Sequence, residues 1–227
     1  MQQPATAGNI HGIPMIIDLH VHESMHSPCA KMTLDDAVQA ARFHGLDGIC
    51  ITNHDSMDIQ NTAADYLRTV DFPVFIVVEL STADGHIVAF GLHSLPASKQ
   101  YEAMVTQDFI NHVNAQGGFC FAAHPFREAA LQEDHFLDAL QGLHGIEIYN
   151  GNNRRSSSNT RAKDACLRLG LVPVAGSDAH KADRLGAYAM WFPEVIADTA
   201  ALVVALKAGK GRPVMRVGCR RYIAPFE

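Results

Sequence analysis

The stretch Leu171-Val172-Pro173-Val174-Ala175-Gly176-Ser177-Asp178-Ala179-His180 gives the clearest indication of the fold. Its first five residues are apolar and typical of a short buried strand. Asp178 and His180 come just past the end of this strand, one residue apart. Because residues i and i+2 of an extended segment point the same way, both side chains can reach one point. This spacing alone is a weak signal, and it gains weight because the arrangement recurs along the chain.

Other apolar segments also end on polar residues. Strands are predicted over residues 15–19, 48–52, 74–78, 86–92, 119–123, 145–149 and 187–192. Helices are predicted over 33–44, 57–69, 134–140, 159–169 and 198–207, and a further helix within 98–116. His86 opens its strand, but the turn at Asp84-Gly85 would bring it back towards Glu79. The candidate metal ligands after these strands are His20, His22, His54, Glu79, His86, His124, Asp178 and His180.

The alternation of strands and helices favours an α/β domain with a parallel sheet. Polar residues at the carboxyl ends of successive strands are typical of barrels, where the loops after the strands face a common centre. A doubly wound open sheet is the alternative, but it concentrates ligands at one switch point. We therefore expect a barrel of about seven strands, with residues 1–227 forming one domain.

Composition narrows the class of protein. The apolar fraction of 48% and the charged fraction of 19% are typical of a globular protein. A net charge of −6 without a basic cluster argues against nucleic acid as a partner. No apolar run has the length of a membrane span, and no secretory signal is visible. Five cysteines without close pairing, two of them in apolar runs, favour a reducing compartment, and we expect a cytoplasmic location.

The thirteen histidines are the first indication of metal chemistry, because imidazole is the commonest transition-metal ligand. Mixed imidazole and carboxylate ligands suit zinc, manganese or iron. Eight ligands exceed one tetrahedral site, so two or three ions are predicted, with Glu79 as a natural bridge. Two ions about 3.5–4 Å apart can share a hydroxide and stabilise a hydrolytic transition state. No Gly-x-Ser-x-Gly, phosphate-loop or dinucleotide motif supports another chemistry.

Other polar residues are assigned ordinary roles. Glu147 lies inside a predicted strand and is expected to support a ligand as a hydrogen-bond partner. The remaining histidines are expected to be hydrogen-bonded or at the surface: His11, His44, His93, His112, His135 and His144.

Five motifs resemble those of the polymerase and histidinol phosphatase (PHP) superfamily of metal-dependent phosphoesterases. They are Asp18-Leu19-His20-Val21-His22, Thr52-Asn53-His54, Glu79 with Gly85-His86, Ala123-His124-Pro125, and Gly176-Ser177-Asp178-Ala179-His180. They occur in the family's order, and jointly they are specific.

The resemblance implies a distorted (β/α)7 TIM-like barrel and two or three divalent ions. It assigns His20, His22, Glu79 and Asp178 to one ion, Glu79, His86 and His124 to a second, and His54 with His180 to a third. It also implies phosphoester hydrolysis by a hydroxide that the metals bridge.

Two positions depart from the family pattern. Ser27-Pro28-Cys29 replaces the usual Ser-Asp-Gly, whose Asp binds the third ion, so His26 or Cys29 would have to substitute. Asn53 replaces the usual Asp before His54. Without a substitute ligand, the centre would hold two ions.

Substrate contacts are predicted from charge. Arg127 follows His124-Pro125 and Arg184 follows His180, so both could neutralise a phosphate at the mouth of the barrel. Asp178 or a histidine free of metal could protonate the leaving group.

We therefore predict a hydrolase of small phosphate mono- or diesters, with Arg127 and Asp178 as candidate catalytic residues. Two alternatives remain: an amidohydrolase-like enzyme that cleaves C–N or C–O bonds, and a non-catalytic regulatory or scaffold domain stabilised by metal.

Overall fold

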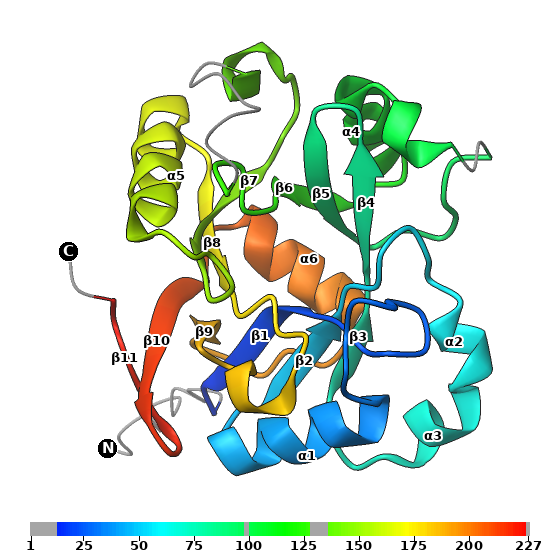
Figure 1. Cartoon of the computed structure of the whole chain (residues 1–227), viewed down its shortest axis with the longest axis vertical. Coiled ribbons are helices and arrows are strands. Elements are labelled where there is room, and N and C mark those ends of the chain that lie inside the picture. Colours follow the sequence, from blue (N-terminus) through cyan, green and yellow to red (C-terminus); the bar gives the residue numbers. More distant parts are fainter. Residues whose placement is uncertain (1–12, 98–99, 128–135, 226–227) are drawn as a thin grey trace, which may run out of the picture.

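The computed structural model of the chain describes residues 13–97, 100–127 and 136–225, and these form two β-sheets with helices around them (Figure 1). The first sheet contains β1 (Met15–Val21), β2 (Gly48–Ile51), β3 (Val74–Ile76), β9 (Tyr188–Phe192), β10 (Arg212–Gly218) and β11 (Arg221–Ile223). The second contains β4 (Val78–Thr82), β5 (Gly85–Phe90), β6 (Phe119–Ala122), β7 (Gly145–Asn150) and β8 (Val172–Gly176).

Each sheet is parallel in one half and antiparallel in the other. The strand orders are β11-β10-β9-β1-β2-β3 and β4-β5-β6-β7-β8. Parallel pairing joins β1 to β2 and β2 to β3, and it also joins β6 to β7 and β7 to β8. The remaining pairs are antiparallel, including the predicted hairpin between β4 and β5. The carboxyl ends of the parallel strands supply most of the candidate ligands, as predicted.

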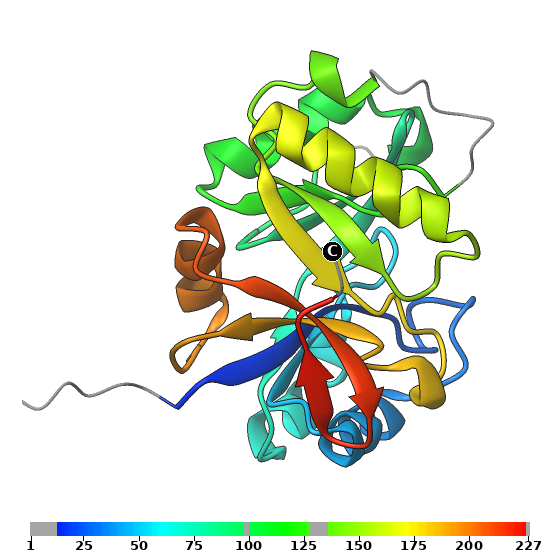
Figure 2. The same ribbon diagram turned by 90° about the vertical axis from the view of Figure 1, so that its left-hand side faces the viewer.

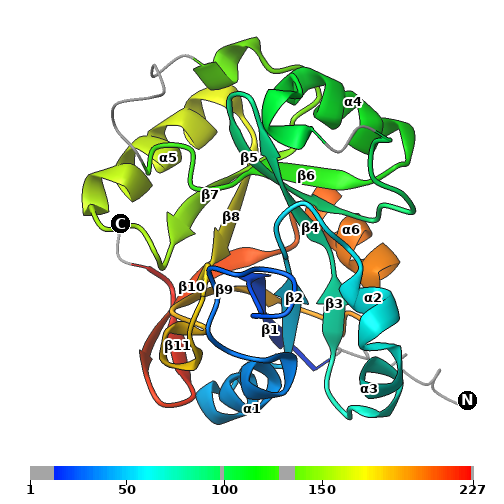
Figure 3. The same cartoon turned by 45° about the vertical axis from the view of Figure 1, so that its right-hand side comes forward.

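The two sheets meet along a seam beside these strand ends. Only Val77 separates β3 from β4, although the two strands belong to different sheets (Figure 3). Isolated parallel bridges pair Val21 with Ala179 and His54 with Glu79 across the seam. The ladders between the described strands therefore do not close into a barrel. The mixed α/β fold is confirmed, whereas the predicted (β/α)7 barrel is not confirmed.

The helices lie outside the sheets. They are α1 (Leu34–His44), α2 (Ile59–Thr62), α3 (Ala64–Thr69), α4 (Thr106–Ala115), α5 (Ser156–Leu169) and α6 (Thr199–Lys207), with 3₁₀ turns η1 (Tyr101–Ala103), η2 (Phe136–Ala139) and η3 (Ala182–Arg184). The helix predicted over 57–69 is divided at Ala63. The helix predicted within 98–116 is α4, and residues 98–99 of that range lie outside the described residues. Of the helix predicted over 134–140, only η2 is described, since residues 128–135 are not.

The first helix forms as its sequence predicts. Thr33 is the N-cap of α1, and a capping box joins its backbone and side chain to Asp36. The helix ends at Gly45, whose φ of 76° is the left-handed conformation that glycine adopts without strain. This helix packs on the first sheet, where its Val38 and Ala41 share a buried cluster with Ile49 of β2.

The main hydrophobic core lies between the sheets. Ile17 and Leu19 of β1 pack in one cluster with Phe90, Phe121 and Phe192, all fully buried. Two residues of α6, Leu202 and Leu206, belong to the same cluster. A second cluster joins α4 and α5 to the second sheet. Substituting a buried phenylalanine of this kind by alanine typically costs about 3–5 kcal/mol.

The C-terminal segment extends the first sheet. Residues 212–223, where no strand was predicted, form the antiparallel hairpin β10–β11 beside β9 (Figure 2). Among the described residues, no helix is long and apolar enough to cross a membrane.

Candidate metal centre

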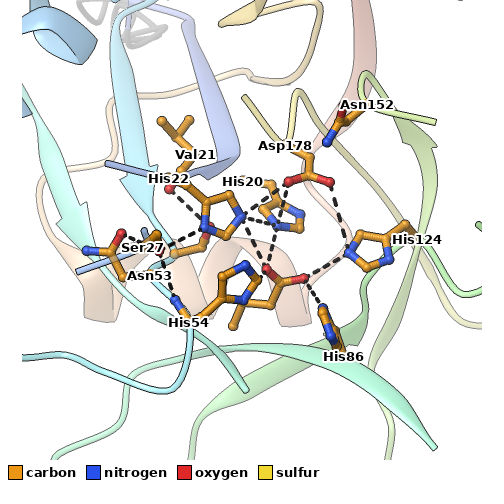
Figure 4. A network of polar contacts seen from close by, with 12 residues as sticks. His20, Val21, His22, Ser27, Asn53, His54, His86, His124, Asn152 and Asp178 are labelled. Atoms are coloured by element: carbon orange, nitrogen blue, oxygen red, sulfur yellow. Dashed lines mark hydrogen bonds and ion pairs between the residues drawn. The ribbon is translucent and has the colours of Figure 1, made fainter. Parts of the chain in front are cut away.

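All eight predicted ligands lie together where the two sheets meet (Figure 4). The first sheet and the loops after its strands contribute His20, His22 and His54, and the second sheet contributes the rest. Their donor atoms form groups of three that lie within 4.8 Å of one another. These groups are His20-His22-Glu79, His20-His124-Asp178, His54-Glu79-His86 and His22-His54-His180.

Glu79, on β4, lies at the middle of this cluster. Its Oε1 is 3.0 Å from His86 Nδ1 and 2.9 Å from His124 Nε2. Its Oε2 is 3.2–3.3 Å from ring nitrogens of His20, His22 and His54. Although buried, Oε2 accepts no hydrogen bond. One carboxylate therefore faces five imidazoles, as a bridging ligand would.

Asp178 closes the cluster from the loop after β8. Its Oδ1 is 3.2 Å from His22 Nε2 and 3.6 Å from His20 Nε2, and its Oδ2 pairs with Arg127. Its φ of 50° is unusual for a residue other than glycine, and aspartate tolerates it better than most. Backbone strain of this kind is concentrated at functional sites.

A glycine lets β8 pass close to β1. A Cβ added to Gly176 would lie 2.5 Å from Cβ of His20 and 3.0 Å from Glu147 Oε1. Any side chain at residue 176 would therefore push β8 away from His20. The sequence Gly176-Ser177-Asp178 thus places Asp178 against the histidines of β1.

Glu147 supports two ligands from behind, as the sequence predicts. Its Oε1 is 3.0 Å from His20 Nδ1, and its Oε2 accepts hydrogen bonds from the His124 backbone N–H and from Asn150. A proton on Nδ1 of His20 leaves the Nε2 lone pair facing the cluster. Partners of this kind fix the tautomer and orientation of a metal-binding histidine.

The residues that sequence reasoning missed form a buried polar network beside His22 and His54. The side chain of Asn53 donates to Glu23 at 2.7 Å and accepts from the Ser27 hydroxyl at 3.0 Å. The same hydroxyl accepts from the His54 backbone N–H at 3.1 Å. Asn53, one of the departures from the family pattern, thus bonds to Ser27, the residue directly before the other departure at Pro28-Cys29. No spacing in the sequence indicates this contact.

The carboxylates and imidazoles shift one another's pKa values. Burial would lower the pKa of His20, but Glu147, Glu79 and Asp178 outweigh it and raise that pKa well above its usual value. Burial would raise the pKa of Glu79, yet the facing histidines hold it well below its usual range. Burial also lowers the pKa of His54 to about 4, so this imidazole is neutral near pH 7. A neutral imidazole is the form that binds metal.

The donor set fits divalent transition-metal ions. Nε2 of His20 and Nε2 of His22 lie 3.1 Å apart, and both face Glu79 and Asp178. When both imidazoles are neutral and Nδ1 of His20 donates to Glu147, these nitrogens turn lone pairs towards one another. Glu79 Oε2 also accepts no hydrogen bond. Cations bound among them would satisfy all of these atoms.

The two candidate replacements for the third ligand do not join the cluster. His26 is bound through Nδ1 to Glu23 at 2.8 Å and through Nε2 to Thr62 at 3.1 Å. Cys29 is exposed. Neither occurs in a group of potential ligands among the described residues.

The two predicted arginines differ in position. Arg127 bonds to Asn150 and Asn153 as well as to Asp178, so it lies at the edge of the cluster. Arg184 is exposed at the end of η3. Within the described residues, no hydrogen bond or ion pair links its side chain to the cluster.

The other histidines lie away from the cluster, as predicted, where they are described. His44 and His112 face the backbone carbonyls of Ala182 and Ser94, and His144 accepts from the Cys120 backbone N–H. His93 is exposed. His11 and His135 lie outside the described residues.

Known proteins share this fold. Residues 156–210 match the PHP-associated family model PHP_C. A protein from Bifidobacterium adolescentis described as a metal-dependent phosphoesterase superposes with a TM-score of 0.62, at 19% identity over 84% of this chain and 96% of that chain. No curated protein sequence matches the chain.

Two further structures extend the comparison. A two-domain protein from Bacteroides vulgatus, which contains a predicted PHP-like metal-dependent phosphoesterase, has a TM-score of 0.66 at 18% identity, covering 91% of this chain and 66% of that chain. The lesion-specific endonuclease PfuEndoQ from Pyrococcus furiosus has a TM-score of 0.65 at 15% identity, covering 86% and 56%. The fold is thus one that PHP-like proteins share. The family match over residues 156–210 includes the last of the five motifs, Gly176-Ser177-Asp178-Ala179-His180, so it agrees with the resemblance at that motif.

Proposed function

We propose that this protein hydrolyses small phosphate mono- or diesters with the help of two or three divalent transition-metal ions. The observation that carries the proposal is the position of Glu79, whose two oxygens lie 2.9–3.3 Å from ring nitrogens of five histidines. A buried carboxylate among that many imidazoles suits a site for adjacent cations. Such ions, when bound, lower the pKa of water and neutralise phosphoryl charge.

The four groups of donors suggest how the ligands would be shared. His20, His22, Glu79 and Asp178 would hold the most deeply buried ion, and Glu79, His86 and His124 a second. For a third ion, the chain offers His22, His54 and His180, without a carboxylate of its own. The native metal would be zinc, manganese or iron, given this mixture of nitrogen and oxygen donors.

Arg127 is the proposed contact for the substrate phosphate. It is the arginine whose guanidinium reaches the cluster, and its side chain is about a quarter exposed, at 27%. Asn150 and Asn153 hold that guanidinium in place. In this position the guanidinium could donate a hydrogen bond to a phosphate oxygen in place of the bond that it now makes to Asp178. Arg184, predicted for the same task, would need to move to take part.

Asp178 is better suited to bind metal than to deliver a proton. Burial would raise its pKa, but His20, His22 and Arg127 hold it well below the usual range, so the group stays ionised. The proton for the departing alcohol would then come from a group other than Asp178. His54 does not supply it near pH 7, because burial lowers the pKa of this imidazole to about 4.

A small substrate is favoured over nucleic acid by the net charge of −6. Because one protein of this fold is an endonuclease, an oligonucleotide belongs in the test.

The test is a substrate panel with protein loaded with manganese, zinc or iron and with chelated protein as the control. The panel contains p-nitrophenyl phosphate, bis-p-nitrophenyl phosphate, nucleotides, a single-stranded oligonucleotide, and p-nitrophenyl esters and anilides of carboxylic acids. We expect metal-dependent release of phosphate or nitrophenol from phosphate esters. Cleavage of carboxyl esters or anilides alone would support the amidohydrolase-like alternative. Tight metal binding without any turnover would support the scaffold alternative.

A further inference from the structure

A pocket of about 740 Å³ lies beside the exposed edge of the metal centre. One side is the loop after His54, with Asp55, Met57 and Asp58, and the other is η1, with Tyr101 and Glu102. Leu95 completes the wall. This volume is within the usual range for small-molecule sites.

The pocket is tied to the metal centre through the backbone. Asp55 directly follows His54, and its N–H donates to the Glu79 carbonyl at 3.0 Å. The Asp55 carboxylate accepts from the Ser81 N–H at 2.7 Å, and Ala83 N–H donates to the Met104 carbonyl beside η1 at 2.9 Å. Both walls are therefore fixed to β4, the strand that carries Glu79.

The edge of the cluster next to Asp55, which His54 forms, is partly exposed. The side chains of His54 and His86 are 29% and 34% exposed, whereas those of His20 and His22 are fully buried. A phosphate held at the cluster must therefore leave its organic part outside, next to these two histidines. Because Asp55 lines the pocket and directly follows His54, the pocket is the space in which the organic part of the ester would lie.

The lining defines the chemistry of the occupant. Asp55, Asp58 and Glu102 are carboxylates, and none of the described lining residues is lysine or arginine. Met57, Leu95 and Tyr101 pack on the core cluster beneath α4, so they form a fixed apolar wall. The pKa of Tyr101 is raised by burial and then by the charges of Asp55 and Asp58, so the three groups share one electrostatic environment.

We propose that this pocket, defined by Asp55, Met57, Asp58, Leu95, Tyr101 and Glu102, binds the alcohol part of a phosphoester that carries a cationic amine or quaternary ammonium group on a short apolar chain. The inference rests on the proposed phosphoesterase function, which it deepens by naming a substrate class. Carboxylates and an aromatic ring together attract such cations. The same lining repels a second phosphate, so it disfavours nucleoside diphosphates and sugar bisphosphates.

The test compares two esters that differ by one charge: phosphocholine and 3,3-dimethylbutyl phosphate, in which carbon replaces the quaternary nitrogen. In the metal-loaded protein, we expect kcat/KM to favour phosphocholine by about tenfold, because exposed ion pairs are individually weak and several add here. The double variant D58N/E102Q should lose most of this preference. The variant D164N removes an exposed carboxylate from α5 and serves as the matched control, which should keep the preference.

Binding calorimetry with both esters separates this inference from the function on which it rests. If neither ester is hydrolysed but phosphocholine still binds more tightly, and D58N/E102Q removes the difference, the phosphoesterase proposal fails and the pocket assignment stands. Equal affinity for the two esters, no binding of either, or a preference that survives in D58N/E102Q would overturn the assignment. A melting curve of each variant shows that the comparison is made on folded protein.

Discussion

The candidate metal centre has an inner group of potential ligands and an outer group, and the two differ in burial. The inner group is His20, His22, Glu79 and Asp178, whose side chains are at most 1% exposed. The outer group is His54, His86 and His180, whose side chains are 22–34% exposed. Burial beside carboxylates fixes the first group, whereas the second faces solvent. The difference suggests that inner ligands retain the ions and outer ligands meet the substrate.

The strongest test removes the charge that both groups share. In E79Q the carboxylate that faces five histidines becomes a neutral amide of the same size. We expect loss of most bound metal and a fall in kcat/KM of about a thousandfold or more, since metal ions supply several kcal/mol of transition-state stabilisation. Elemental analysis and phosphate release measure the two effects. Full metal content with more than about a tenth of the wild-type rate would contradict the central role of Glu79.

A second test acts on the inner group through its supporting residue. Glu147 contacts His20 and the backbone of His124 but belongs to no group of potential ligands. E147Q should lower metal affinity by about 10–100-fold, the usual effect of removing such a partner. Competition with a fluorescent chelator measures the affinity. E194Q, at an exposed glutamate paired with Lys210, is the matched control and should bind metal normally.

The two groups should also differ in their response to pH. Burial would lower the pKa values of His20 and His22, but the facing carboxylates outweigh it and raise both. For His54 and His180 burial prevails, so their pKa values are lowered. Near pH 7 in the metal-free protein, the inner imidazoles thus hold protons that metal must displace, while His54 and His180 hold none. Metal affinity should therefore fall as pH falls, by about tenfold per pH unit for each proton displaced, as long as pH stays below the raised pKa values.

Calorimetry of metal binding in two buffers with different ionisation enthalpies counts the protons released. Release of at least one proton near pH 7 is expected. An enthalpy that does not depend on the buffer would mean that the inner histidines are already neutral without metal.

The smallest effect is expected for the outer group alone. H180A removes an imidazole that forms a group of donors with His22 and His54 but leaves Glu79 untouched. At most one ion should be lost, and the affinity for the remaining ions should fall less than in E147Q. The metal content of H180A is compared with that of the variant H54A. Loss of the same amount of metal in both would show that the two histidines bind the same ion. Loss of all metal in H180A would remove the distinction between the two groups.

Part of the candidate site could be predicted because strands impose simple geometry. His20 and His22, or Asp178 and His180, face one point because they are two residues apart after a strand. The capping box at Thr33 follows from an equally local pattern, and in these cases spacing along the chain determines which groups can meet. The supporting role of Glu147 was predicted from its place inside a strand, but its contact with His20 joins residues 127 positions apart.

Other features depend on contacts between distant segments, which spacing does not show. The apolar run 74–78 indicates one strand, yet the chain changes sheets at Val77. Phe43 fits the apolar pattern of α1 but is 64% exposed, because the first sheet contacts the opposite face of the helix. The network of Glu23, Ser27 and Asn53 joins residues up to 30 positions apart.

The split of the ligands between the sheets has a mechanical consequence. Val21 lies between His20 and His22, Ala179 lies between Asp178 and His180, and these two residues form one of the bridges across the seam. Ions bound here would tie the two halves of the molecule together, much as a reversible cross-link does. The resistance of the fold to heat would then depend on the concentration of free metal, and chelation would loosen the protein first along this line.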